Sequence, residues 1–144
     1  MKFVLFTVLA YLLAMAYSQS ITIGTPADGD VLTPGTNITI QVLRPDSLTA
    51  SQEVSIVISL LACTGSRCTD PASQLGTTLY SGGFDPQFPA NRTPTDQPQQ
   101  NITVAVPATL TSGPVQLAIT HLALVGAGPY IMLEIKNLTL AVAQ

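Results

Sequence analysis

The sequence has little charge, no tryptophan and almost no histidine or cysteine. Of its 144 residues only 9% are charged, and it contains one His, two Cys and no Trp. Five basic residues stand against eight acidic ones, which gives a formal net charge of −3. Because no basic patch is available to bind phosphates, we expect no nucleic acid and no anionic membrane surface among its partners.

The residues that build most active sites are equally scarce. His121 is the only histidine, Glu53 and Glu134 are the only glutamates, and no Ser or Cys lies in a recognisable nucleophile motif. We interpret both glutamates as solvated strand residues, since a glycosidase needs a carboxylate pair beside aromatic sugar platforms. We interpret His121 as a packed or hydrogen-bonded residue near a strand end, with a metal ligand or general base as the alternative. The sequence predicts no enzymatic activity, no metal site and no cofactor.

The first 18 residues have the pattern of a secretory signal peptide. A basic residue at position 2 precedes the apolar run Phe3 to Ala16, and Ala16 and Ser18 are the small residues of a cleavage site before Gln19. The run is shorter than the roughly 20 residues of a membrane span. We therefore predict a signal peptide at residues 1–18, a single domain at residues 19–144, secretion to the extracellular space and no membrane anchor.

The two cysteines lie close together, with four residues between Cys63 and Cys68. A structural zinc site needs four ligands, and thioredoxin-like chemistry needs two intervening residues. In the oxidising environment outside the cell, the sequence predicts one structural disulfide that closes a short surface loop.

Alternation with a period of two dominates the chain after residue 18, which is typical of half-buried strands. The apolar sets that we expect to face the core are Ile38, Ile40 and Val42; Val54, Ile56, Ile58 and Leu60; Ile102, Val104 and Val106; and Val115, Leu117 and Ile119. Turns rich in Pro, Gly, Asp and Ser separate them. The pattern predicts an all-β fold, an antiparallel β-sandwich of immunoglobulin or fibronectin type III character with about seven strands.

Two strands break this alternation. Ile131, Leu133 and Ile135 are out of phase with the apolar residues 138, 140 and 142, so we predict a bulge or sheet crossing at Lys136-Asn137 that turns both sets to the core. A similar slip is expected near Thr120 and His121, because residues 122 and 124 leave the phase of residues 115 to 119.

Residues Gly82 to Gln100 form a long proline-rich segment that we expect to be irregular. Tyr80, Phe84 and Phe88 lie in or just before it, and Tyr130 is the other aromatic residue after position 18. In one interpretation Tyr80 ends a strand while Phe84 and Phe88 seal the sandwich. In the other, these aromatic residues are contacts for a protein partner.

Four acceptor sequons for N-glycosylation follow the predicted signal peptide. Their acceptor residues are Asn37, Asn91, Asn101 and Asn137. In three of them the middle residue belongs to an inward apolar set, so the Asn and Thr on either side point outward together. The sequence thus predicts a glycoprotein.

Several blocks of the sequence resemble a known family of fungal proteins. They are RPDSLTAS at residues 44–51, EVSIVI at 53–58, LGTTLYSG at 75–82, FDPQF at 84–88, HLALVGAGPY at 121–130, and Glu134. Together they are similar to the fungal necrosis-inducing secreted protein 1 effector family. The resemblance implies a secreted effector that binds plant immune receptor-associated kinases, suppresses pattern-triggered immunity and can provoke plant cell death. We expect the protein to be a monomer. It also implies action in the host apoplast or host cell, and it assigns no catalytic residue.

A second resemblance is to fungal cell-wall proteins of β-glucan assembly that carry an immunoglobulin-like amino-terminal domain. It rests on Ile21 to Ile23, Pro26, Gly35 and the strand from Asn37 to Val42. The tryptophan expected at the end of this strand is missing. A wall-associated protein is therefore the alternative to the effector.

Overall fold

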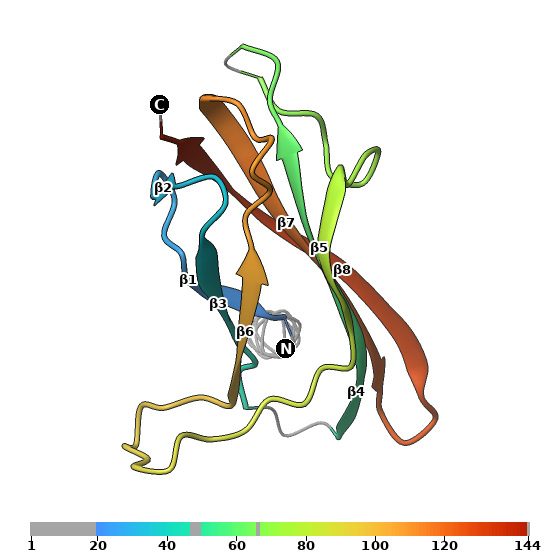
Figure 1. Ribbon diagram of the computed structural model, residues 1–144. Coiled ribbons are helices and arrows are strands. Elements are labelled where there is room, and N and C mark those ends of the chain that lie inside the picture. The colour runs from blue at the N-terminus through green and yellow to red at the C-terminus, as the bar shows by residue number, and fades with distance from the viewer. Residues whose placement is uncertain (1–19, 47–49, 66, 144) are drawn as a thin grey trace, which may run out of the picture.

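The computed structural model describes residues 20–46, 50–65 and 67–143, and within these ranges it contains strands and no helix (Figure 1). The predicted signal peptide lies outside the described residues. The eight strands are β1 (Thr22–Thr25), β2 (Val31–Leu32), β3 (Asn37–Leu43), β4 (Ser51–Ala62), β5 (Thr77–Gly82), β6 (Gln99–Ala105), β7 (Gly113–Val125) and β8 (Tyr130–Val142).

The strands form two facing sheets. One has three strands in the order β1-β3-β6, and the other has five in the order β2-β8-β7-β4-β5. All pairs are antiparallel except the short parallel pairing of β2 with β8. The predicted all-β sandwich is confirmed.

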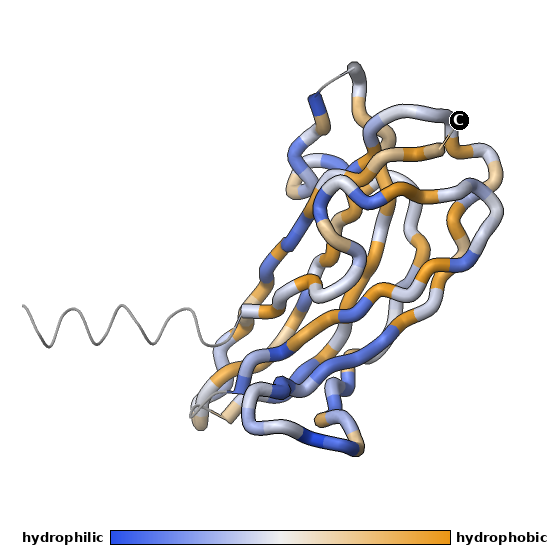
Figure 2. Tube along the Cα trace, turned by 90° about the vertical axis from the view of Figure 1, so that its left-hand side faces the viewer, coloured by the Kyte–Doolittle hydropathy of each residue, from blue (hydrophilic) through white to orange (hydrophobic). Residues whose placement is uncertain are grey.

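The core lies between the sheets and is built by the inward residues of the alternating strands. Ile40 and Ile102 come from the three-stranded sheet, while Ile58, Leu117 and Leu140 come from the five-stranded sheet, and all are at most 6% exposed. Figure 2 shows the resulting alternation of hydrophobic and hydrophilic positions along the strands. Burying each such side chain contributes about 1.5–3 kcal/mol to folding, which explains why the period-two pattern selects this fold.

Strand β4 departs from the predicted pattern at Val54, which is 40% exposed instead of buried. The pairing of β4 with β7 shifts by one residue between Glu53 and Ser55. This β-bulge leaves Val54 without a direct partner on β7, so Glu53 and Ile56 point to the interior although they are three residues apart. The prediction of a regular strand with Val54 inward was wrong because one inserted residue reverses the side-chain phase.

Strands β7 and β8 are regular, contrary to prediction. Their register runs without a shift from Gly113 opposite Val142 to Val125 opposite Tyr130. The predicted slip in β7 and the predicted bulge at Lys136-Asn137 are both wrong. The outward leucines of β7 lie directly opposite Ile131 and Leu133 of β8, so these apolar residues pack as cross-strand pairs on the outer face and need no bulge to reach the core.

The connections agree with the sequence in two places. Cys63 and Cys68 form the predicted disulfide, in the loop after β4. The segment between β5 and β6 is largely irregular, as predicted, and Gln87 is tied to Gln99 by two backbone hydrogen bonds of 3.0 and 2.9 Å. This long connection is thereby fixed against the start of β6.

Candidate functional site

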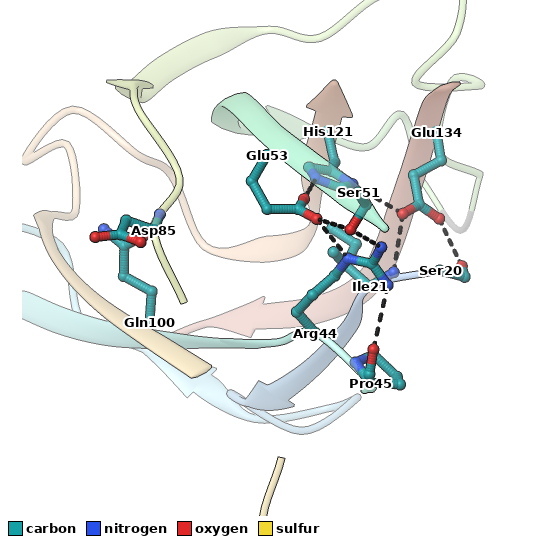
Figure 3. A network of polar contacts seen from close by, with 10 residues as sticks. All are labelled: Ser20, Ile21, Arg44, Pro45, Ser51, Glu53, Asp85, Gln100, His121 and Glu134. Carbon is teal, nitrogen blue, oxygen red and sulfur yellow. Dashed lines mark hydrogen bonds and ion pairs between the residues drawn. The ribbon is translucent and has the colours of Figure 1, made fainter. Parts of the chain in front are cut away.

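Four ionisable side chains meet between the two sheets, in a chain that has few charges altogether. They are His121 on β7, Glu53 on β4, Glu134 on β8, and Arg44, which directly follows β3. Figure 3 shows His121 between the two glutamates, with Arg44 reaching Glu53. We call these four residues the buried charge cluster.

The strand register brings the cluster together. His121 lies opposite Glu134 on β8 and opposite Ile56 on β4. Directly opposed residues of antiparallel strands share a face, so His121 and Glu134 both point inward. Glu53 joins them through the β4 bulge, because regular alternation from Ile56 back to Glu53 would turn the Glu53 side chain to solvent. The bulge is thus the feature of the fold that completes the cluster.

Both ring nitrogens of His121 contact carboxylate oxygens. Nδ1 lies 2.9 Å from Oε1 of Glu134, and Nε2 lies 2.5 Å from Oε2 of Glu53. The His121 side chain is 0% exposed, whereas those of Glu53 and Glu134 are 13% and 15% exposed. A neutral imidazole has one N–H and an imidazolium has two. With both glutamates ionised, only the imidazolium can donate to both carboxylates, so this geometry favours a protonated His121.

Each glutamate has further partners that belong to other parts of the chain. Arg44 donates from Nε to Oε1 of Glu53 at 2.9 Å and from Nη2 to the Ser51 hydroxyl at 3.0 Å. Glu134 accepts hydrogen bonds from the Ser20 hydroxyl at 2.5 Å and from the Ile21 backbone N–H at 2.8 Å. Ser20 and Ile21 directly precede β1, and Arg44 directly follows β3. The cluster therefore joins the three-stranded sheet to the five-stranded sheet.

These contacts shift all three pKa values away from the ordinary ones. Burial alone raises the pKa of Glu53, but hydrogen bonds from His121 and Arg44 and the positive charge of Arg44 outweigh it and lower that pKa from 4.5 to about 2. Burial likewise raises the pKa of Glu134, while donors from His121, Ser20 and Ile21 lower it further than burial raises it. Burial lowers the pKa of His121, and the two carboxylates raise it above 6.5. The favoured state is a buried, internally neutralised set of charges.

A hollow of about 420 Å³ adjoins the cluster and is bordered by Arg44, Glu53 and Phe84. Phe84 packs edge-on against the His121 ring at 5.3 Å between centroids and is 4% exposed. The interpretation of Phe84 as an exposed partner contact was therefore wrong, because this side chain fills the space beside the imidazolium. Its alternative, that Phe84 seals the sandwich, is confirmed.

The other three aromatic residues named from the sequence do not join Phe84 at one surface. Tyr80 is partly buried against the core, and its hydroxyl donates to the Gly83 carbonyl oxygen at 3.1 Å. Phe88 is partly buried in the loop, with the Arg92 guanidinium 3.5 Å from its ring centroid. Tyr130 is 56% exposed at the start of β8.

The outer faces of the two sheets differ in chemistry. Asn37 and Asn101 are exposed on the three-stranded sheet, where the Thr39 and Thr103 hydroxyls lie 3.0 Å apart. Asn91 is exposed in the long loop and Asn137 on β8. All four sequons are thus accessible, and their glycosylation stays a prediction.

The five-stranded sheet carries an apolar patch near the β7–β8 turn. Leu122 lies opposite Leu133, and Leu124 lies opposite Ile131. We call these four residues the hairpin face. Ile131 and Leu133 are 73% and 64% exposed. Among the described residues of β4, β7 and β8, the charged side chains lie at positions that point to the interior of the sandwich. The hairpin face itself therefore carries no charge.

The sequence did not predict the buried charge cluster. The prediction that His121 is packed and hydrogen-bonded is confirmed, whereas the interpretation of Glu53 and Glu134 as solvated was wrong. A usable signal existed, because His121 continues the inward phase of residues 115, 117 and 119, and Glu134 continues that of residues 138, 140 and 142.

The described ranges hold neither a cluster of metal-ligating side chains nor a membrane-spanning helix. No group of three or more His, Cys, Asp and Glu side chains there is placed to hold a metal ion. No helix in that part of the chain is long and apolar enough to cross a membrane.

Comparison with known proteins gives one family. The model of the Nis1 family matches residues 14–141. A search of curated proteins found no match. Among solved structures, the crystal structure of a cellulose-active polysaccharide monooxygenase from M. thermophila is similar with a TM-score of 0.45 and 14% sequence identity. The alignment covers 82% of this chain and 55% of that one, so this chain spans about half the length of the monooxygenase.

Proposed function

Because the chain belongs to the Nis1 family of fungal effectors, we propose that it is a secreted effector that binds plant immune receptor-associated kinases. By occupying a surface of the kinase it suppresses pattern-triggered immunity, and plant cell death can follow. The observation that carries this proposal is the family match over residues 14–141. The disulfide between Cys63 and Cys68 supports secretion, since such bonds persist in oxidising compartments.

The proposed mode of action is binding and not catalysis. His121 is enclosed, with both ring nitrogens engaged by carboxylates. Neither ring nitrogen is therefore available to act as a general base on a nucleophile or substrate. A cluster arranged in this way serves the structure of the sandwich.

The hairpin face is the proposed contact for the kinase. Ile131 and Leu133 are large, apolar and mostly exposed, and contiguous exposed apolar groups mark interaction sites more often than scattered ones do. Glycans at Asn37 and Asn101 would cover the other sheet. An uncharged contact of this kind fits an apolar surface on the partner, and its affinity should depend little on salt.

The test is a binding measurement between the secreted protein and purified kinase domains of plant immune receptor complexes, with glucan beads in parallel. We expect kinase binding, and a loss of affinity of about tenfold or more for Ile131→Ser combined with Leu133→Ser, which removes two exposed apolar anchors. Val31→Ser is the matched control, because Val31 is 65% exposed on β2, outside the hairpin face. This control variant should bind like the wild type.

Three results would contradict the proposal. Absence of kinase binding rejects the effector mechanism, and retention on β-glucan beads alone supports the wall-associated alternative. Equal losses for the hairpin variant and for Val31→Ser reject the hairpin face as the contact. Thermal stability measured on the same variants separates a lost contact from a lost fold.

A further inference from the structure

The buried charge cluster makes part of the fold depend on pH. The carboxylate of Glu53 lies 2.5 Å from Nε2 of His121, and the carboxylate of Glu134 lies 2.9 Å from Nδ1. If the ring loses one proton, one nitrogen presents a lone pair to a carboxylate at hydrogen-bond distance. Repulsion in this enclosed position is strong, because few water molecules screen it. One of the two carboxylates must then move.

The charged groups around His121 come from β4, from β8 and from the residue that follows β3. Glu53 lies on β4, Glu134 and Lys136 on β8, and Arg44 after β3, with Lys136 Nζ 3.7 Å from Oε2 of Glu134. Asp46 and Asp85 border the adjoining hollow. The described residues of β1, β5 and β6 contribute no charged side chain.

The two carboxylates are not equally well held. Glu53 keeps a direct ion pair with Arg44 at 2.9 Å, and arginine stays charged over the whole range. Glu134 has only the more distant Lys136, whose side chain is 40% exposed, besides the neutral donors Ser20 and Ile21. When the ring loses its proton, Glu134 is therefore the carboxylate that moves toward solvent.

We infer that protonated His121 is a lock that fastens the segment Ser20–Ile21, and with it the entry into β1, to the five-stranded sheet in mildly acidic surroundings. Loss of the ring proton to solvent base releases Glu134, and Glu134 releases the Ser20 hydroxyl and the Ile21 N–H. The edge strand β1 thereby loosens while β3, held through Arg44 and Glu53, stays in place. The device adapts the secreted protein to an acidic exterior and marks β1 as the element that responds to alkalinisation.

The direction of the pKa shifts agrees with this geometry. The pKa of His121 is raised above 6.5, so its contribution to stability is complete below pH 6.5 and is lost as pH rises through the raised value. The pKa of Glu53 is lowered from 4.5 to about 2, and that of Glu134 is lowered as well, so their contributions are complete above pH 4.5 and are lost in stronger acid. The contribution of the lock to stability is therefore complete between about pH 4.5 and 6.5, and the lock opens as pH rises through the raised pKa of His121.

The experiment is an NMR titration of the secreted protein between pH 4.5 and 9, produced without a histidine tag. Since His121 is the only histidine, the ring Hε1 signal has a single origin and its midpoint gives the pKa directly. We expect a midpoint above 6.5 and a loss of hydrogen-exchange protection at the Ile21 amide with the same midpoint, after correction for the intrinsic pH dependence of exchange. The Val42 amide in β3 should keep its protection.

A pair of variants completes the test. Glu134→Gln should lower the midpoint of His121 and uncouple the Ile21 amide from it. Asp96→Asn is the matched control, because Asp96 also has a lowered pKa but lies in the long loop with its carboxylate bonded to Thr93. A wild-type midpoint at or below 6.5, an Ile21 amide whose protection ignores the titration, or equal effects of both variants would overturn the inference. The wild-type midpoint and the protection of the Ile21 amide test the inference even if a variant fails to fold.

Discussion

The interior of this sandwich has two regions built from different chemistry. Along β7 the inward residues are first apolar, at Val115, Leu117 and Ile119, and then His121 follows in the same phase. The apolar region is held by non-directional burial, which tolerates substitutions that conserve volume. The charged region depends on matched partners, so one missing partner leaves a buried charge without compensation. A few ionisable residues can thus connect two sheets, but the stability that they contribute depends on pH.

The largest expected effect comes from breaking the charged region with His121→Leu. This change leaves the two carboxylates facing an apolar side chain, and we expect a loss of about 3–5 kcal/mol in unfolding free energy at pH 6. Adding Glu134→Leu should recover part of that loss, because it removes one of the stranded charges. Chemical denaturation at pH 6 measures both variants.

The matched pair in the apolar region is Leu117→Ala alone and with Leu140→Ala, where the second truncation should add a further loss of about 2–5 kcal/mol. If Glu134→Leu added to His121→Leu lowers stability further, the two regions respond alike and the predicted difference between them is contradicted.

A smaller effect is expected where the regions meet, at Phe84. This ring contacts His121 and belongs to the apolar core cluster, so Phe84→Ala should cost about 3–4 kcal/mol of stability. Phe88→Ala in the same segment should cost about 1 kcal/mol, since it removes mainly the contact with Arg92. Thermal unfolding of the two variants gives the comparison. Equal small losses would show that Phe84 is not a core residue.

The sequence predicted the apolar region well and the charged region poorly. Period-two alternation identified Ile40, Ile58, Leu117 and their neighbours as core residues, because burial imposes that period directly. The disulfide also followed from spacing and compartment. These features depend on local pattern, which the sequence contains.

The charged region depends on one inserted residue and on pairing between distant strands. Nothing local distinguishes Val54 from an inward strand residue, yet its place in the bulge turns Glu53 to the interior. The meeting of Glu53, His121 and Glu134 then follows from the registers of β4, β7 and β8, which alternation alone does not fix. His121 and Glu134 lie in the same alternating phase as the inward residues of their strands. The apolar residues 131 and 133 nevertheless favoured the wrong prediction that they too face the core.

The most direct test of the account is the unfolding free energy of the wild-type protein as a function of pH from 3 to 9. The account predicts a maximum between about pH 4.5 and 6.5, with a decline in acid as Glu53 and Glu134 gain protons. On the alkaline side, between pH 6.5 and the raised pKa of His121, stability should fall by up to about 1.4 kcal/mol per pH unit and then level off. His121→Leu should lack this alkaline decline. Wild-type stability that stays constant or rises from pH 6 to pH 9 would contradict a buried imidazolium holding the two sheets together.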